Sequence, residues 1–332
     1  MGIRRHGPPI EEDRTDMATA VHVPVLLEET VELLAPALDV DGAVLVDATL
    51  GLGGHAEAML SRFPGLTLVG IDRDPAALEL AGERLRPFGE RAQLVHAVYD
   101  EIPDVLERLG IRSVQGVLFD LGVSSMQLDL DDRGFSYSRD TPLDMRMDAG
   151  ETRTAETIVN TYPEAELARI FRDYGEEKLA RRYARSIVDA RAAAPLRRSA
   201  ELVGVLDAAT PAALKKSGHP GKRVFQALRI EVNRELEVLA AAIPAALDAL
   251  AIRGRIVVLS YHSLEDRIVK RAITARTVST APRGLPVEPS EAAPTFRMLT
   301  RGAPGAGDPE VGRNPRAASV RLRSAERVRG NA

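Results

Sequence analysis

The first segment that could do chemistry is the loop Gly51-Leu52-Gly53-Gly54-His55, which follows an apolar run ending at Asp47. Glycine tolerates positive φ and lets a ligand approach the backbone, and the helix-compatible sequence after the loop would supply unpaired N–H donors. Gly51, Gly53 and Ala56 also satisfy the dinucleotide fingerprint G-x-G-x-x-A. The loop therefore predicts a nucleotide-type cofactor site, although a purely structural glycine turn would look the same.

Two aspartates accompany this loop. Asp72 ends the next apolar run, about 20 residues after Gly53, where a carboxylate can accept both hydroxyl groups of a ribose. Asp47 stands just before the loop and suits a cationic ligand better than a pyrophosphate. Asp47 therefore favours S-adenosylmethionine over NAD, while its alternative role is to organise the loop by accepting hydrogen bonds from backbone N–H groups.

A third acidic position opens the segment Asp120-Leu121-Gly122-Val123-Ser124-Ser125-Met126-Gln127-Leu128. It follows another apolar run, at the edge where doubly wound sheets bind their ligands. A carboxylate here could accept a hydrogen bond from an attacking amine and so free its lone pair. Asp120 could equally cap the strand or contact the cofactor.

The last such segment is Ser260-Tyr261-His262-Ser263-Leu264-Glu265-Asp266-Arg267. Ser263 and Asp266 fit a capping box that would open a helix. Tyr261 and His262 are then a stacking ring and a titratable ring beside the pocket, although a single histidine is often only structural.

These segments need a scaffold, and the apolar pattern predicts one. Short β-branched or aliphatic runs at residues 43–48, 67–71, 93–96, 116–119 and 255–260 are mostly separated by helix-length segments. This alternation predicts an α/β fold with a parallel, doubly wound sheet. After residue 271 the chain is rich in Pro, Gly and Arg, so we expect a long surface excursion there and then a closing strand at 319–322. Residues 1–20 have no apolar period and are expected to be a flexible leader, followed by an amphipathic helix that ends before Pro36.

The alternation of strands and helices is interrupted between the fourth and fifth strands. About 130 residues lie there, which is too many for a single crossover helix. Two apolar stripes with helical spacing lie there: Leu179, Tyr183 and Ile187, and then Leu228, Val232, Leu236, Leu239 and Ile243. We therefore expect a discontinuous main domain at 21–130 and 230–332, and an inserted helical substrate-recognition domain at 131–229.

Composition limits the functional class. The chain has no cysteine, which excludes disulfides, thiolate nucleophiles and cysteine-ligated zinc. It has no apolar segment long enough to span a bilayer, so we expect a cytoplasmic protein. The net charge of −4 is unevenly distributed along the chain. Residues 169–229 carry 14 Lys and Arg against 6 Asp and Glu, and residues 267–332 carry 13 Lys and Arg against 5 Asp and Glu. Localised basic surfaces on an acidic body fit a nucleic-acid partner, as would solvated helix faces with a basic tail.

Taken together, the motifs resemble the bacterial MraW/RsmH family. They occur in family order from His22 to about Arg327: His22-Val23-Pro24-Val25-Leu26-Leu27, Gly51-Leu52-Gly53-Gly54-His55, Ile71-Asp72-Arg73-Asp74-Pro75, Asp120-Leu121-Gly122-Val123-Ser124-Ser125, Arg133-Gly134-Phe135-Ser136, Pro142-Leu143-Asp144-Met145-Arg146-Met147-Asp148, Tyr174-Gly175-Glu176-Glu177, Ser260-Tyr261-His262-Ser263-Leu264-Glu265-Asp266-Arg267 and Asn314-Pro315-Arg316-Ala317. The resemblance implies a Rossmann-like methyltransferase fold with an inserted helical domain, and methylation of a cytosine N4 atom in the decoding centre of 16S rRNA.

The resemblance also implies which residues would do this. By motif, the contacts to S-adenosyl-L-methionine are Gly53, Gly54, His55, Asp72, Tyr99, Asp120 and Gln127. Asp120 and His262 are the catalytic candidates near the amine, and no metal is required. The expected partner is 16S rRNA within the small ribosomal subunit, bound by the inserted helices and the basic C-terminal segment. A homodimer is a further expectation.

Two other functions stay open on the sequence. An NAD(P)-dependent oxidoreductase would use the same glycine loop and Asp72. A non-catalytic rRNA-binding assembly factor could retain a cofactor pocket without using it.

Overall fold

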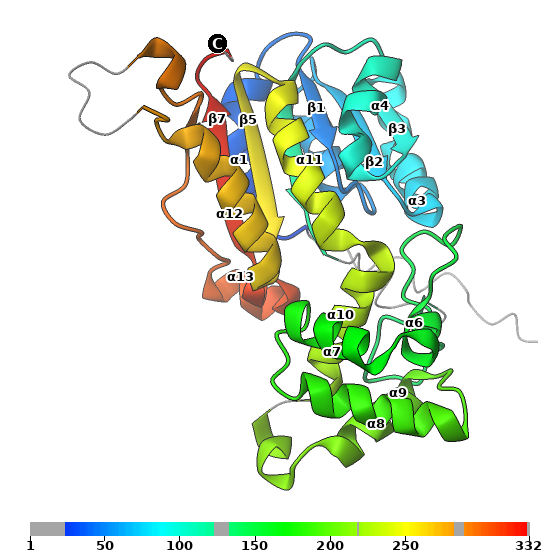
Figure 1. Cartoon of the computed structure of the whole chain (residues 1–332). Coiled ribbons are helices and arrows are strands. Elements are labelled where there is room, and N and C mark those ends of the chain that lie inside the picture. The colour runs from blue at the N-terminus through cyan, green and yellow to red at the C-terminus, as the bar shows by residue number, and fades with distance from the viewer. Residues whose placement is uncertain (1–23, 123–132, 218, 282–288, 331–332) are drawn as a thin grey trace, which may run out of the picture.

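The computed structural model describes residues 24–122, 133–217, 219–281 and 289–330, and Figure 1 shows its α/β body with a helical unit at one end. The strands are β1 Val44–Asp47, β2 Thr67–Asp72, β3 Ala92–His96, β4 Val114–Asp120, β5 Leu250–Ser260, β6 Phe296–Met298 and β7 Arg321–Arg327. The helices around them are α1 Leu27–Leu38, α2 Gly54–Arg62, α3 Pro75–Leu85, α4 Ile102–Arg108, α11 Glu235–Ala249, α12 Ser263–Thr277 and α13 Asp308–Arg313, with short 3-10 turns η1 Arg86–Arg91, η2 Tyr99–Glu101, η5 Ser290–Ala292 and η6 Pro315–Ser319. In this described part, no helix is long and apolar enough to cross a membrane.

The strands of the described chain form one sheet in the order β3-β2-β1-β4-β5-β7-β6. Strands β1 to β5 pair in parallel, whereas β7 runs antiparallel to both β5 and β6. The order reverses between β1 and β4, so the carboxyl ends of these two strands flank the crevice in which such sheets bind ligands. The Rossmann-like α/β fold predicted from the sequence is confirmed.

Alternate residues along the central strands face opposite sides of the sheet, as the two-residue period of a strand requires. Leu45 and Leu118 pack in the layer of α1, α2 and α3, and their neighbours Val46 and Val117 pack in the layer of α4, α11 and α12. All four side chains are fully buried. The sheet is therefore held rigidly from both sides, and its carboxyl edge is left for the site.

The inserted helices are α6 Ala155–Thr161, α7 Glu164–Asp173, α8 Ala180–Ala193, α9 Ser199–Ala209 and α10 Gly221–Asn233, with η4 Ala212–Ser217. Their buried residues, from Phe135 to Val232, form a hydrophobic cluster separate from the two that flank the sheet. Figure 1 shows these helices beyond the carboxyl ends of the strands. The chain boundaries of this unit, 131–229, stay a prediction, and α10 runs through the predicted end at 229.

The second apolar stripe is divided between two helices instead of one. Leu228 and Val232 belong to the inserted cluster, whereas Leu239 and Ile243 belong to the sheet cluster. Arg234, with φ 52°, separates α10 from α11. Apolar spacing continues across this turn, which is why the sequence did not show it.

Two local predictions were wrong. α1 continues through Pro36 to Leu38, because Ala37 and Leu38 are buried against the sheet and their packing outweighs the backbone hydrogen bond that proline cannot donate. The region after residue 271, read as a long surface excursion, begins inside α12 and contains the edge strand β6, whose Phe296 is buried.

Candidate active site

A cavity of about 460 Å³ opens at the carboxyl edge of the sheet. Side chains from the ends of β2, β4 and β5 line it together with the glycine loop, and the inserted helices add residues from the other side. The lining residues include Gly51, Gly54, His55, Asp72, Tyr99, Asp120, Met147, Lys222, Arg229, Tyr261 and Arg316. Five of the predicted site residues therefore share one cavity: Gly54, His55, Asp72, Tyr99 and Asp120.

Asp72 holds the glycine loop and the next turn in place. Its Oδ2 atom accepts a hydrogen bond of 2.8 Å from the amide of Gly51, and its Oδ1 atom accepts one of 2.9 Å from the amide of Asp74. Burial raises the pKa of this carboxyl above its usual range. Each carboxylate oxygen has a further lone pair, so Asp72 could also accept hydroxyl groups of a ligand.

The predicted contacts Gly53 and Gly54 have different roles. Gly53 is the N-cap of α2 with φ 76°, a backbone conformation that favours glycine, and it does not line the cavity. Gly54 does line it, but a Cβ atom there would lie 2.6 Å from Pro24 Cγ. Glycine is required at both positions, for a turn at the first and for close packing of Pro24 at the second.

Asp120 is the centre of a polar cluster at the end of β4. Its Oδ1 atom accepts a 2.6 Å hydrogen bond from the hydroxyl group of Tyr261, and its Oδ2 atom lies 3.7 Å from His55 Nδ1. His55 Nε2 in turn lies 3.1 Å from the carbonyl oxygen of Val25. Burial and the nearby carboxylate raise the pKa of Tyr261, so this phenol stays protonated and orients Asp120 as a donor.

Tyr99 brings a flat ring to the cavity wall. The ring packs edge-on against Phe119, with centroids 5.7 Å apart and an interplanar angle of 79°. Its hydroxyl group donates to the carbonyl oxygen of Glu235 at 3.4 Å, and burial raises its pKa. The ring is thereby fixed in orientation and can stack on a planar ligand.

His262 does not line this cavity, and its catalytic role stays a prediction. It is the N-cap of α12, so the capping box is formed by His262 and Glu265, one residue before the predicted Ser263 and Asp266. Its Nε2 atom lies 3.1 Å from Glu265 Oε1. Burial opposes ionisation of Glu265, but His262 keeps the pKa of this carboxyl below its usual range. The ring therefore serves the helix terminus.

Glu235, His262 and Glu265 offer ligand atoms within 4.8 Å of one another. Both carboxylate oxygens of Glu235, however, accept hydrogen bonds of 2.8 Å from Arg229. A cation would have to displace a partly buried guanidinium group, so these side chains fit an ion-pair network better than a metal centre.

Asp47 is nearly fully buried beneath the loop and does not line the cavity. Its Oδ1 atom accepts a hydrogen bond of 3.2 Å from the amide of Thr49. Burial raises the pKa of this carboxyl to about 7, and the nearby carboxylates of Asp120 and Asp72 add to the effect. The contact to Thr49 matches the loop-organising alternative for Asp47.

Replacing Asp47 with asparagine should make stability less dependent on pH. The folded-state pKa of about 7, against an ordinary value of 3.8, means that the folded protein binds this proton more tightly than the unfolded chain does. The free energy of unfolding therefore falls as pH rises from about 4 to about 7, by roughly 4 kcal/mol for one fully shifted group. Thermal denaturation across this range should show a shallower fall for Asp47→Asn than for the wild type, and parallel curves would contradict the assignment.

Gln127, the last predicted cofactor contact, lies outside the described residues. The sequence analysis did not predict that the insertion contributes residues to the cavity. These residues are Met147, Lys222 and Arg229. Lys222 and Arg229 are two helical turns apart on α10 and so face the same side, a spacing that was visible in the sequence. The sequence predicts a stacking ring at Tyr261 but not its hydrogen bond to Asp120, because that bond depends on the pairing of β4 with β5.

Comparison with known proteins finds a matching family and similar sequences. A model of the MraW methylase family matches residues 19–328. A "Ribosomal RNA small subunit methyltransferase H" of Leifsonia xyli subsp. xyli is 64% identical over 316 residues, covering 95% of this chain and 97% of the relative. A protein of the same description from Clavibacter michiganensis subsp. michiganensis is 64% identical over 309 residues, covering 93% and 97%. One from Saccharopolyspora erythraea is 62% identical over 309 residues, covering 93% and 94%.

Proposed function

The chain belongs to the MraW methylase family, and from this we propose that it transfers a methyl group from S-adenosyl-L-methionine to the N4 amine of a cytidine in the decoding region of 16S rRNA. The single observation that carries the proposal is the cavity at the sheet edge, where Asp72 and Asp120 lie with the ring of Tyr99. Carboxylates that can accept ribose hydroxyls, and a fixed aromatic ring, are the groups that a cationic nucleoside requires.

The residues of the cavity fit this cofactor better than a dinucleotide. Asp72 would accept the ribose hydroxyls, Tyr99 would lie against the adenine, and the carboxylate of Asp120 favours positive charge. When bound, S-adenosyl-L-methionine supplies an electrophilic methyl group on a sulfonium.

Asp120 and Tyr261 prepare the amine. The N4 lone pair of cytosine is delocalised into the ring, and a carboxylate that accepts a hydrogen bond from the amine makes that lone pair more available. The hydroxyl group of Tyr261, 2.6 Å from Asp120 Oδ1, fixes the orientation of the carboxylate. Alignment of the amine with the methyl group supplies much of the remaining acceleration. The cytidine has to be unstacked to reach this cavity.

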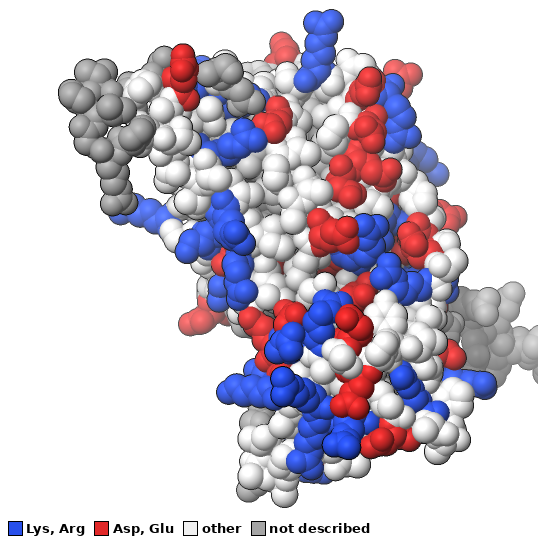
Figure 2. Space-filling view, viewed as in Figure 1, with Lys and Arg blue, Asp and Glu red and all other residues white. Residues whose placement is uncertain are grey.

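The RNA surface in this proposal is a basic stripe, defined as Lys178, Arg181, Arg182, Arg185, Lys270 and Arg271. These side chains are exposed, and within the described chain none has a hydrogen bond or ion pair to another side chain. Figure 2 shows Lys and Arg gathered along α12 and the adjoining inserted helices, with acidic side chains on the other side of this face. Glu176 joins the two halves, since it accepts hydrogen bonds from Ser263 at 2.7 Å and from Arg267 at 3.3 Å. Lys222, from neighbouring α10, lines the cavity.

Replacing Arg181 and Arg185 together with glutamine should weaken binding to small ribosomal subunits about tenfold at low salt and lower the salt slope by up to about 2. The reason is the loss of phosphate contacts, so filter binding at several salt concentrations is the measurement. The matched control replaces Arg108 and Arg112, which are exposed near the opposite, amino end of β4. Equal losses in the two double variants would contradict the assignment of the stripe.

Methyl incorporation into purified small subunits tests the proposed function directly. With labelled S-adenosyl-L-methionine, label should enter 16S rRNA of intact subunits but not naked rRNA or DNA, and digestion should yield N4-methylcytidine. Tight binding to subunits without incorporation would instead support a non-catalytic assembly factor. Label in another nucleoside would refute the N4 assignment.

A further inference from the structure

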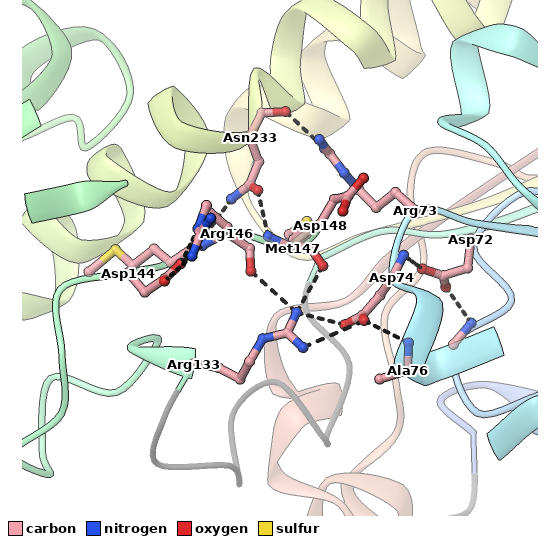
Figure 3. A network of polar contacts seen from close by, with 12 residues as sticks. Asp72, Arg73, Asp74, Ala76, Arg133, Asp144, Arg146, Met147, Asp148 and Asn233 are labelled. Carbon is pink, nitrogen blue, oxygen red and sulfur yellow. Dashed lines mark hydrogen bonds and ion pairs between the residues drawn. The ribbon is translucent and has the colours of Figure 1, made fainter. Parts of the chain in front are cut away.

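Polar contacts connect the turn after β2 to the chain where it enters the inserted helices (Figure 3). The guanidinium of Arg133 donates to Asp74 Oδ2 at 2.8 Å. It also donates to the carbonyl oxygens of Met147 at 2.8 Å and Arg146 at 3.3 Å. One arginine thus ties the segment around Met147 to a turn that begins at Asp72.

Asn233 makes the corresponding connection where the chain leaves the inserted helices (Figure 3). Its Nδ2 atom donates to the carbonyl oxygen of Met145 at 2.8 Å, and its Oδ1 atom accepts from the amide of Met147 at 2.8 Å. Its own carbonyl oxygen accepts a 2.9 Å hydrogen bond from Arg73. Entry, exit and the β2–α3 turn therefore form one connected network.

This network is buried and each part depends on the others. Asp74 is 1% exposed and Asn233 is 3% exposed. Asp74 also caps α3 by accepting a hydrogen bond from the amide of Ala76 at 3.1 Å. Charge-assisted hydrogen bonds to a buried carboxylate are strong, so the Arg133–Asp74 link resists small displacements of the insertion.

The network also reaches both walls of the cavity. On one side, Asp72 precedes Arg73 and Asp74 and lines the cavity. On the other side, Met147 of the network and Arg229 of α10 line the cavity. The carbonyl oxygen of Arg229 accepts a 2.9 Å hydrogen bond from Asn233. The same contacts therefore set the distance between the two walls.

We propose that Arg133 and Asn233 are positioning residues that couple the cofactor loop to the inserted helices, so that cofactor binding at Asp72 sets where the insertion presents the target base. This inference rests on the proposed function. Neither residue touches the reacting atoms. Each acts by holding Met147 and α10 against the turn that carries Asp72.

Arg146 provides a matched control within the same segment. Like Arg133, it binds one carboxylate, that of Asp144 at 2.7 Å, and two backbone carbonyls, those of Ala149 and Glu151. All its partners are in its own segment, whereas Arg133 reaches across to Asp74. Arg133→Lys and Arg146→Lys therefore remove similar guanidinium contacts, and only the first weakens the link to the cofactor turn.

Hydrogen exchange with S-adenosylhomocysteine as the probe tests the coupling without methyl transfer. In the wild type and in Arg146→Lys, the probe should slow amide exchange at residues 145–147 and 228–233 as well as in the glycine loop. In Arg133→Lys the probe should still bind, but protection should stop at the loop and the β2–α3 turn. Asp74→Asn cuts the same link and keeps the α3 cap, because asparagine is an equally good N-cap.

Steady-state kinetics supply the second readout. For Arg133→Lys and Asp74→Asn, kcat/KM for small subunits should fall about tenfold while KM for S-adenosyl-L-methionine stays within about twofold. Arg146→Lys should keep both values. Partial unfolding would also lower kcat and leave KM unchanged, so rates are referred to the fraction of enzyme that binds S-adenosylhomocysteine, which separates positioning from folding.

The outcomes separate the two proposals. If the wild type fails to bind S-adenosylhomocysteine, the proposed function fails and the coupling with it. If the probe binds but Arg133→Lys and Asp74→Asn show the protection and kinetics of Arg146→Lys, the coupling alone is overturned.

Discussion

Replacing Asp120 with asparagine should lower kcat for methyl transfer by a factor of about 10² to 10³. Asparagine has nearly the same shape, but it is neutral and is a weaker acceptor for the amine N–H group. Cofactor affinity should fall less, by about tenfold, because the carboxylate also favours the cationic sulfonium. Single-turnover methylation of small subunits measures the first effect, and calorimetry with S-adenosylhomocysteine and S-adenosyl-L-methionine measures the second.

Tyr261→Phe is the companion variant, because it removes only the hydroxyl group that orients Asp120. Its control is Tyr162→Phe, which removes a comparable bond of 3.2 Å from Tyr162 to Glu231 outside the cavity. Tyr261→Phe should slow methyl transfer and leave cofactor affinity unchanged, whereas Tyr162→Phe should do neither. If Asp120→Asn retained the wild-type rate, Asp120 would not assist the amine.

Replacing Asp72 with alanine should weaken cofactor affinity about 100-fold. Two hydrogen bonds from ribose hydroxyls to a carboxylate are together worth about 3 kcal/mol, which is two powers of ten in the dissociation constant. The Gly51 amide also loses its acceptor, so the loop itself is less well held. Isothermal titration calorimetry with S-adenosylhomocysteine is the measurement.

Asp148→Ala is the matched control for Asp72. Asp148 also organises a turn, accepting a hydrogen bond of 2.8 Å from the amide of Gly150, but it does not line the cavity. Its replacement should leave affinity within about twofold. Undiminished binding by Asp72→Ala would refute the assignment of Asp72 to the ribose.

The sheet and its acidic edge could be predicted because they follow from local pattern. Each parallel strand is a short apolar run, and a doubly wound topology brings the carboxyl ends of such runs to one edge. Asp72 and Asp120 each stand at the end of a run, so their shared place at the cavity needed no knowledge of side-chain orientation. The antiparallel edge strand β6 was missed, because Phe296–Met298 is too short to show a period.

Side-chain direction was harder to predict than position. His262 and Tyr261 are adjacent and follow the same strand, yet only Tyr261 faces the cavity. The deciding feature is Glu265, whose Oε2 atom accepts hydrogen bonds from the amides of both residues while its Oε1 atom contacts the His262 ring. This contact depends on helix-cap geometry, which residue types alone do not specify.

The contribution of the insertion was also out of reach from the sequence. Met147 and Arg229 are far apart in the chain and reach the cavity only because Asn233 holds their segments together. The spacing of apolar residues predicts the helices but not the turn at Arg234, after which α11 returns to the sheet. Long-range polar contacts of this kind leave no periodic signal in the sequence.

We infer that the methyl donor binds between the glycine loop, Asp72, Tyr99 and Asp120. Crystals grown with S-adenosylhomocysteine test this binding site. We expect ligand density in this cavity, with the ribose at Asp72, the adenine against Tyr99 and the sulfur towards Asp120. Density for the ligand at any other place on the chain, with this cavity filled only by solvent, would contradict it.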